Sequence, residues 1–309
     1  MQGVSVAVAV IGIVLASFLA RFDPVFGAAQ VSAVDCDQRQ SLTAALLILR
    51  AGETLRVNGT CLANIVIDER LTNVTLDGQG TAVINPADPT AYTITVRGRG
   101  ITIRGFTING GTEVVYIQDG GAALIDGNTI QGGLNGVFVT RSSSAHIVNN
   151  TIQGNSEAGI LINENSSARI GFLLSEERTA SPNAIQFNGT SGITVTRSSN
   201  ARIVGNSIND NRRDGVSVNR LSVAEISANV INANGGDGIA VSHNSGVHLG
   251  RDTGTGIMDL PNSGENAGVG VRCTIGGYAD GRIGPLDSGD VNFDTGSGPE
   301  GGCINSLAP

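Results

Sequence analysis

The 309-residue sequence predicts an all-β solenoid, in which short parallel strands wind into stacked coils behind one short N-terminal helix. Two observations predict this fold. The middle of the chain repeats with a period of 22–23 residues. Each copy alternates Val and Ile with small polar residues, which is the pattern of short strands joined by turns. The composition agrees with a β fold. Helical bundles are rich in charged helix formers such as Glu and Lys, and charged residues make up only 15% of this chain.

The repeat is clearest from residue 136 onward. The segment Gly-Val-Phe-Val-Thr-Arg-Ser-Ser at Gly136 matches Gly-Ile-Thr-Val-Thr-Arg-Ser-Ser at Gly192. Copies begin at Gly136, Gly159, Gly192, Gly215 and Gly238. The intervals are 23, 33, 23 and 23 residues, so the long one is a period plus ten residues. Drifted copies extend back through Val115 and Ile94, so coils are expected over most of the chain.

One such unit cannot bury its apolar face alone, whereas stacked units share a continuous core. The recurring elements are Gly-[Val/Ile]-x-Val, a Ser-Ser or Ser-Asn turn, and Asn-[Thr/Ser/Val]-Ile. On these motifs, residues 60–272 resemble the right-handed parallel β-helix proteins of the pectate-lyase (pectin-lyase-like) superfamily. The resemblance implies a single-stranded right-handed parallel β-helix with three strands per coil, and it matches no specific enzyme.

Asparagine recurs at one phase of the repeat. It lies fourteen residues after the leading glycine, or at the corresponding place in drifted and inserted copies: Asn128, Asn150, Asn183, Asn206 and Asn229. Stacked amides of this kind hydrogen-bond from coil to coil. We therefore interpret these residues as a structural ladder.

The N-terminal segment predicts export. Residues 1–29 contain an uncharged apolar run from Val4 to Ala20 and end in the small residues Gly27, Ala28 and Ala29, as in a signal peptide. No Lys or Arg precedes the apolar run, so an uncleaved anchor is the alternative. After cleavage we expect no membrane span, and a secreted, periplasmic or cell-surface location.

The remaining chain divides into three parts. Residues 30–59 are expected to form an N-terminal cap with an amphipathic helix that begins after Ser41 as N-cap. Residues 60–272 form the β-helix, and the Gly- and Asp-rich residues 273–309 a C-terminal cap. Caps at both ends would protect the exposed sheet edges of a solenoid.

The four cysteines form one pair near each end of the chain. In an exported protein an even number of cysteines predicts disulfides. Among three pairings we choose the local one, Cys36–Cys61 and Cys273–Cys303. A metal site is the alternative, although no Cys-x-x-Cys or Cys-His spacing supports it.

The sequence assigns no catalytic residue. Five residues after the leading glycine lies a column of alternating charge, which we interpret as ion pairs: Asp119, Arg141, Glu164, Arg197, Arg220 and His243. The outward side chains of the first strand of each coil are neutral and short. Three superfamily motifs are absent, namely Trp-x-Asp-His, Gly-His-Gly and Asp-Pro-His-Asp. Familiar lyase, hydrolase and epimerase activities are therefore disfavoured.

No cofactor is expected, with one weak exception. Asp290, Asn292 and Asp294 have the spacing of the first ligands of a calcium loop, although the glycine and glutamate that should follow are displaced. A solvated acidic turn is the default interpretation of this segment.

Two insertions give the best functional hypothesis. They follow Gly171 and Gly250, at the same phase of the repeat and three coils apart, or ~14 Å. Loops on one flank would wall a groove, for which the predicted residues are Arg169, Arg202, Glu225, Asp210, Arg212, Arg213, Asp214, Glu176, Arg178 and Arg251. The alternative is that solenoid turns simply tolerate insertions.

These observations predict a secreted scaffold that binds extracellular or cell-surface carbohydrate polymer. A divergent polysaccharide lyase or glycoside hydrolase and a structural or adhesive envelope protein are the alternatives. The net charge of −8 without basic clusters excludes nucleic acid as the expected partner. We expect a monomer.

Overall fold

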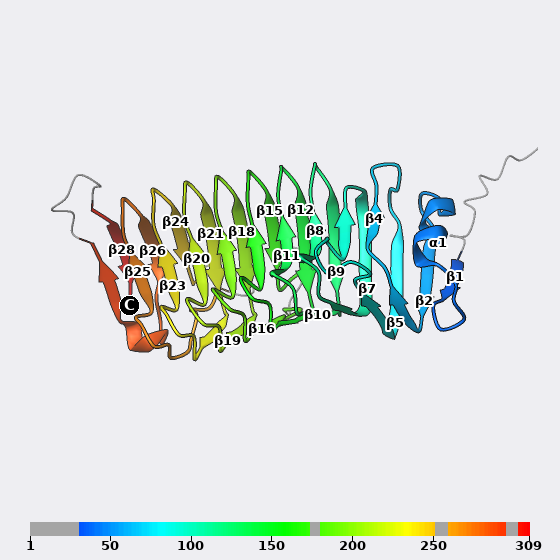
Figure 1. Cartoon of the computed structure of the whole chain (residues 1–309). Helices are drawn as coiled ribbons and strands as arrows, with labels where there is room; N and C mark the ends of the chain where they lie inside the picture. Colours follow the sequence, from blue (N-terminus) through cyan, green and yellow to red (C-terminus); the bar gives the residue numbers. More distant parts are fainter. Residues whose placement is uncertain (1–30, 174–179, 251–258, 295–301) are drawn as a thin grey trace, which may run out of the picture.

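The computed structural model describes residues 31–173, 180–250, 259–294 and 302–309. In it the chain winds into an elongated stack of coils, with α1 (Leu42–Ile48) near one end and β28 at the other (Figure 1). All strand pairing is parallel, and most coils contribute three short strands. The predicted all-β right-handed parallel β-helix is therefore confirmed.

The first face of each coil is a separate sheet of ten strands. In stacking order it contains β4 (Ile65–Ile67), β6 (Ile94–Val96), β8 (Glu113–Ile117), β11 (Asn135–Val139), β14 (Ile160–Ile162), β17 (Ile193–Val195), β20 (Val216–Val218), β23 (Ile239–Val241), β25 (Val271–Cys273) and β27 (Val291–Phe293).

The second face runs along the whole length of the described structure. It contains β1 (Val31–Asp35), β2 (Thr54–Asn58), β5 (Thr75–Asn85), β7 (Arg99–Asn109), β9 (Ala122–Asp126), β12 (Ser144–Val148), β15 (Ser167–Ile170), β18 (Asn200–Val204), β21 (Val223–Ser227), β24 (Gly246–Leu249), β26 (Tyr278–Arg282) and β28 (Ile304–Ala308).

The third face begins with β3 (Thr60–Leu62). The long strands β5 and β7 bend through two faces, and their second halves join β3 to the rest. The face continues with β10 (Thr129–Gln131), β13 (Thr151–Gln153), β16 (Ala184–Gln186), β19 (Ser207–Asn209) and β22 (Val230–Asn232).

The core is built from columns of identical side chains. Because side chains alternate along a strand, every second residue points inward. On the second face one inward column holds Ile147, Ile170 and Ile203, all 0% exposed. On the third face Ile152 and Ile185 do the same. Full burial of each such side chain stabilises the fold by about 1.5–3 kcal/mol. Because the columns run from coil to coil, the stack has one continuous core.

Two asparagine ladders hold the turns. The predicted residues Asn128, Asn150, Asn183, Asn206 and Asn229 bond in series, each amide donating to the next at 2.8–3.1 Å, and the ladder continues to Asn262. A second ladder, which the sequence analysis missed, contains Asn155, Asn188, Asn211, Asn234 and Asn266. Both ladders satisfy buried backbone carbonyls between the faces, as with Ile170 and Ile185.

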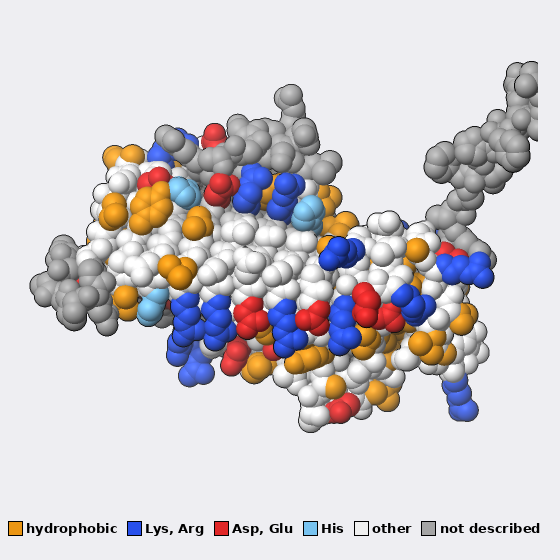
Figure 2. Space-filling model, turned by 90° about the horizontal axis from the view of Figure 1, so that it is seen from above, with side chains coloured by type: hydrophobic (Ala, Val, Ile, Leu, Met, Phe, Trp, Pro, Cys, Tyr) orange, Lys and Arg blue, Asp and Glu red, His pale blue; other side chains and the backbone are white. Residues whose placement is uncertain are grey.

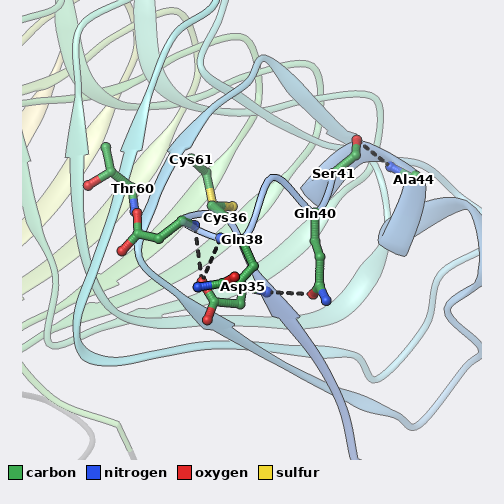
Figure 3. Close-up of a disulfide and its surroundings, with 9 residues drawn as sticks. Asp35, Cys36, Gln38, Gln40, Ser41, Ala44, Thr60 and Cys61 are labelled. Atoms are coloured by element: carbon green, nitrogen blue, oxygen red, sulfur yellow. Dashed lines mark hydrogen bonds between the residues drawn. A yellow bond between two sulfur atoms is a disulfide. The ribbon is translucent and has the colours of Figure 1, made fainter.

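At the N-terminal end the helix and the disulfide are as predicted, although β1 and β2, inside the segment expected to be a cap, belong to the second face. Ser41 caps α1, since its hydroxyl accepts a hydrogen bond from the Ala44 amide at 3.2 Å. Cys36 and Cys61 form a disulfide beside this cap (Figure 3). The helix contacts β4, and its Leu42 and Leu46 are buried. The predicted signal peptide, residues 1–29, lies outside the described residues.

At the C-terminal end the strand pairing continues beyond residue 272. β26 pairs with β24 and then with β28, while β25 pairs with β27. The segment expected to be a cap therefore contributes strands to both sheets. The predicted disulfide between Cys273 and Cys303 is present and ties β25 to the residue before β28. No helix in the described ranges has the length and apolar character needed to cross a membrane.

Candidate functional site

One outward column on the second face brings arginine, histidine and carboxylate side chains into line. We call it the outer row, and register pairing orders it as Thr102, Leu124, His146, Arg169, Arg202, Glu225, His248, Asp280 and Ser306. Successive members lie one strand spacing apart, so the row is ~38 Å long. Figure 2 shows charged side chains gathered in two rows along the molecule, with uncharged side chains between them.

The middle of the outer row is a packed cationic surface. The guanidinium of Arg202 lies 4.7 Å from the centre of the Phe172 ring, and that of Arg169 lies 5.7 Å from it. Phe172 is buried beneath them and begins the first insertion. Arg202 also forms an ion pair with Glu225 at 3.0 Å, with both side chains largely buried. Cation–π packing therefore fixes two guanidinium groups side by side.

The C-terminal part of the row is a hydrogen-bonded cluster. His248 Nδ1 lies 2.7 Å from an Asp280 carboxylate oxygen, and the Tyr278 hydroxyl donates to the other oxygen at 2.7 Å. Tyr278 comes from the neighbouring column, where its ring lies over Gly246, so that a Cβ there would be only 2.7 Å from the ring. Burial and the bond to Asp280 raise the pKa of Tyr278 to about 12. A hollow of about 340 Å³ opens beside His248, Asp280 and Arg282.

The N-terminal part of the row is uncharged except for its histidine. A hollow of about 230 Å³ lies over Thr102, Leu124 and His146. Burial, followed by the neighbouring Arg169, lowers the pKa of His146, which favours the neutral imidazole. The row thus has a hollow near each end and a filled cationic middle.

Both insertions leave the coil at the same place, as the spacing predicts. Gly171 and Gly250 follow register-equivalent ends of β15 and β24 and both have positive φ. The first insertion closes where the Ser181 amide donates to the Gly171 carbonyl at 2.7 Å. Arg282 holds the second, donating to the carbonyls of Gly250 and Asp259. Three predicted residues of the groove walls lie outside the described residues: Glu176, Arg178 and Arg251.

Four predicted groove residues lie elsewhere on the coil. Asp210, Arg212, Arg213 and Asp214 belong to the turn that leads from β19 into β20, so the third face separates them from β18 and Arg202. Arg212 and Arg213 are exposed there. Burial raises the pKa of Asp214, whose carboxylate accepts the Asp237 amide at 3.0 Å. The structure therefore brings together Arg169, Arg202 and Glu225, but not this turn.

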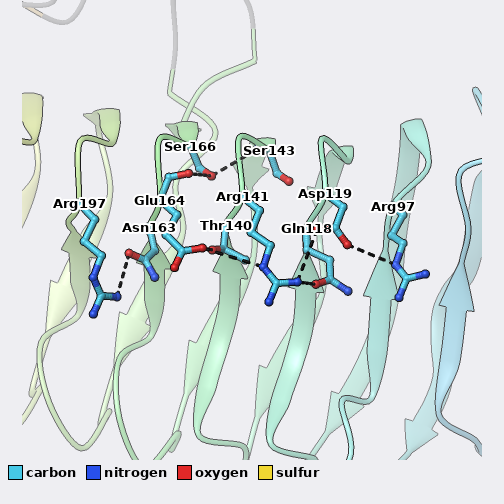
Figure 4. Close-up of polar contacts among 10 residues, drawn as sticks. All are labelled: Arg97, Gln118, Asp119, Thr140, Arg141, Ser143, Asn163, Glu164, Ser166 and Arg197. Carbon is cyan, nitrogen blue, oxygen red and sulfur yellow. Dashed lines mark hydrogen bonds and ion pairs between the residues drawn. The ribbon is translucent and has the colours of Figure 1, made fainter.

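The alternating charge column at the first turn is a set of exposed ion pairs. Arg141 lies between Asp119 at 3.5 Å and Glu164 at 4.0 Å, and Arg97 pairs with Asp119 at 3.7 Å (Figure 4). These side chains are 42–55% exposed, so each pair contributes less than about 1 kcal/mol. Their separation by an arginine leaves no carboxylate pair facing a common substrate.

The calcium candidate lies along an extended strand. Asn292 belongs to β27 between Asp290 and Asp294, so alternate side chains are ~7 Å apart rather than wrapped around a point. Across the described part of the chain, no group of three or more His, Cys, Asp or Glu side chains is arranged to hold a metal ion.

The first face carries outward aromatic side chains on β8 and β11, so the expectation of short outward side chains is wrong there. Tyr92 and Tyr116 have ring centres 4.3 Å apart, and Tyr116 and Phe138 5.2 Å. Nearby, burial raises the pKa of Glu113 to about 7. Tyr116 and Glu113 lie in a drifted copy of the repeat, where an alignment of the outward positions would have revealed them.

Comparisons with solved structures find similar chain paths at low sequence identity. Pectate lyase Pel9A aligns with a TM-score of 0.48 and 12% identity over 80% of this chain and 78% of its own. The mannuronan C-5 epimerase AlgE4 A-module of Azotobacter vinelandii gives 0.48 and 14% over 91% and 94%. A mutant of the periplasmic alginate epimerase AlgG gives 0.46 and 18% over 89% and 54%. No curated protein matches the chain.

A family model gives the clearest result. The model described as right handed beta helix region matches residues 92–253, more than half of the chain. These residues contain the coils that build the middle of the outer row. The chain therefore belongs to the right-handed β-helix family.

Proposed function

We propose that the protein is an exported β-helix scaffold that binds an acidic polysaccharide along the outer row. The continuous register of this row carries the proposal, because it sets cation, carboxylate and imidazole side chains on one straight line of ~38 Å. A polymer repeats its functional groups along its length. A row that offers one side chain per coil matches such a ligand better than it matches a compact small molecule.

Within the row, Arg169 and Arg202 favour a polymer that carries carboxylates, while Glu225 and Asp280 balance their charge over the row as a whole. Guanidinium groups bind carboxylates through paired hydrogen bonds, and Phe172 already holds those of Arg169 and Arg202 in place. Little side-chain entropy remains to be lost on binding, which favours affinity. The two disulfides fit an oxidising compartment outside the cytoplasm, where such polymers occur.

The experiment compares two double variants with the same loss of charge. Arg169→Ala with Arg202→Ala removes the packed arginines, whereas Arg212→Ala with Arg213→Ala removes exposed arginines from the β19–β20 turn. On immobilised polygalacturonate and alginate we expect the first variant to lose at least about tenfold in affinity and the second to bind like the wild type. If both variants lose affinity equally, or if the wild type binds neither polymer, the outer row has only a structural role.

Catalysis is the second candidate, and one observation favours it. His248, Asp280 and Tyr278 are joined by hydrogen bonds of 2.7–3.1 Å beside a hollow, an arrangement able to transfer protons at a bound sugar. A lyase would release unsaturated uronates, and a hydrolase would release reducing ends. If the wild type forms product and His248→Gln and Tyr278→Phe each abolish it, the protein is an enzyme. If the wild type binds a polymer without forming product, catalysis on that polymer is excluded.

A further inference from the structure

A second row of polar side chains lies on the third face, away from the outer row. Five outward carboxamides in consecutive coils bond in series: Asn85, Asn109, Gln131, Gln153 and Gln186. Their N–H···O distances are 2.8–3.1 Å. Unlike the buried asparagine ladders, these amides point outward from the strands and are only half-buried.

The amide row borders the largest of the surface hollows described for this chain. The hollow has a volume of about 570 Å³ and is lined by Asn109, Gly110, Gln131, Gly132, Gln153, Gly154 and Phe187. Every lining residue is uncharged. The three glycines follow the amides in successive coils and leave the floor without side chains, so a ligand can approach the backbone.

The amides retain hydrogen-bonding capacity toward this hollow. A carboxamide has two N–H donors and two oxygen lone pairs. In Gln131 and Gln153 the ladder uses one donor and one lone pair. Each therefore offers a further donor and acceptor, repeated at the strand spacing of ~4.8 Å.

Phe187 is the second, independent observation. Its φ is +56°, in the left-handed region that bulky residues rarely adopt. The equivalent residues are Gly132 and Gly154 in the preceding coils, with φ of +78° and +63°, and Asp210 and Ala233 in the following coils, both with φ of +54°. Its side chain is 58% exposed. The left-handed turn belongs to the repeat, so what distinguishes this coil is the exposed aromatic ring that the turn holds at the end of the groove.

We propose that this groove binds an uncharged saccharide chain. The Phe187 ring would stack on the apolar face of one sugar ring, and the free donors and acceptors of Gln131 and Gln153 would bond its hydroxyls. The uncharged lining offers nothing to neutralise a carboxylate, so an acidic polymer is not the ligand here. This site is separate from the outer row and does not depend on its function.

The test uses a substitution that relieves strain. Phe187→Gly restores the residue found in the preceding coils, so the variant should fold with an unchanged or higher melting temperature. Binding of cello-, manno-, xylo- and malto-oligosaccharides is measured by calorimetry. We expect at least one neutral series to bind the wild type, to weaken about tenfold in Phe187→Gly, and to be retained in Phe187→Trp.

The two sites are distinguished by crossed variants. The Arg169→Ala and Arg202→Ala double variant should keep neutral-saccharide affinity, and Phe187→Gly should keep any affinity for acidic polymer. The proposal is overturned if no neutral series binds the wild type or if Phe187→Gly binds as well as the wild type. The proposal is also overturned if the protein binds no saccharide but forms a dimer in sedimentation that depends on Phe187, because the groove would then be an interface with a second copy.

Discussion

At the scale of single residues, the turn between the first and second faces concentrates backbone strain. In the coils from β8 to β25 two successive residues have positive φ there, as in Arg141 with Ser142 and Arg220 with Leu221. The left-handed conformation costs residues other than glycine about 1–2 kcal/mol, less for asparagine. Each coil accepts this cost because the turn must reverse direction within a fixed strand spacing.

Leu221 is the least suited residue in this column. It has a φ of +63° and is 64% exposed, while the adjacent coils place Ser198 and Asn244 at the equivalent turn position and the coil before Ser198 places Asn165 there. Leu221→Asn should therefore raise the free energy of unfolding by about 1 kcal/mol, measured as a higher thermal midpoint. Leu62→Asn, on an exposed strand position, is the control and should give no gain. Equal effects in both would attribute the gain to surface polarity rather than backbone conformation.

Glu113 predicts the pH dependence of stability. Burial raises its pKa to about 7 from an ordinary value of 4.5. The folded state thus binds the proton more tightly than the unfolded state, so the unfolding free energy decreases between about pH 4.5 and 7 and stays low above that range.

Removing the charge tests this expectation. Glu113→Gln keeps an acceptor for the Asn135 amide, which donates to Glu113 at 3.2 Å. The variant should be more stable than the wild type at pH 8, by an amount on the order of 2 kcal/mol, and similar at pH 4.5. Urea unfolding at the two pH values measures the difference. A wild-type advantage at pH 8 would show that ionised Glu113 stabilises the fold.

At the scale of elements, the buried asparagine ladder holds neighbouring coils together. Asn206 donates to the carbonyls of Ile170 and Val204 and to Asn229, and accepts from both nitrogens of Asn183. Asn206→Ala would leave several of these groups buried without a partner. At about 1–3 kcal/mol for each unsatisfied group, we expect a loss of at least about 3 kcal/mol.

Thermal unfolding measures this loss against a matched variant. Asn209→Ala removes an asparagine from the same coil, but its amide donates only to Ser207 among the contacts described. The control should change stability by less than about 1 kcal/mol. If both variants lose the same amount, the ladder contributes no more than a surface amide.

The repeat predicted the elements well because its phase is also a position on the coil. The position ten residues after the leading glycine holds His146, Arg169 and Arg202, and the strand register places these three on one column. The same count could not reach Asp280, because the second insertion and the aperiodic C-terminal segment intervene. Asp280 was therefore not recognised as the partner of His248, although a carboxylate is an ordinary partner for a histidine.

The cross-section of the coil was the other part that sequence could not supply. Phase orders residues along the chain, but it does not say how sharply each turn bends. Arg212 lies only ten residues after Arg202, yet the third face stands between them. Phe187 was missed for a related reason, since its strain and exposure depend on the backbone of its turn rather than on composition.

At the scale of the whole molecule, both ends of the solenoid are covalently tied. Cys36–Cys61 joins the residue after β1 to β3 on the third face, and Cys273–Cys303 closes the last coils. The first bridge spans 25 residues, for which loop entropy predicts about 3 kcal/mol of stabilisation.

In a repeat protein each coil depends on its neighbours, so losing one end should have a local effect. Cys36→Ser with Cys61→Ser should lose hydrogen-exchange protection in β1 to β5 while β17 to β22 stay protected. Uniform loss along the chain would show that the solenoid unfolds as one unit.

Length is the property that relates the whole molecule to its proposed ligand. The outer row extends ~38 Å in one straight line, so a polymer bound along it should gain contacts until it spans the row. The most direct test is the affinity of oligogalacturonates and oligomannuronates of increasing length for the wild type. We predict that affinity rises with each added sugar until the oligomer matches the row and then levels off, whereas affinity that is constant beyond the shortest oligomers would contradict a binding track along the second face.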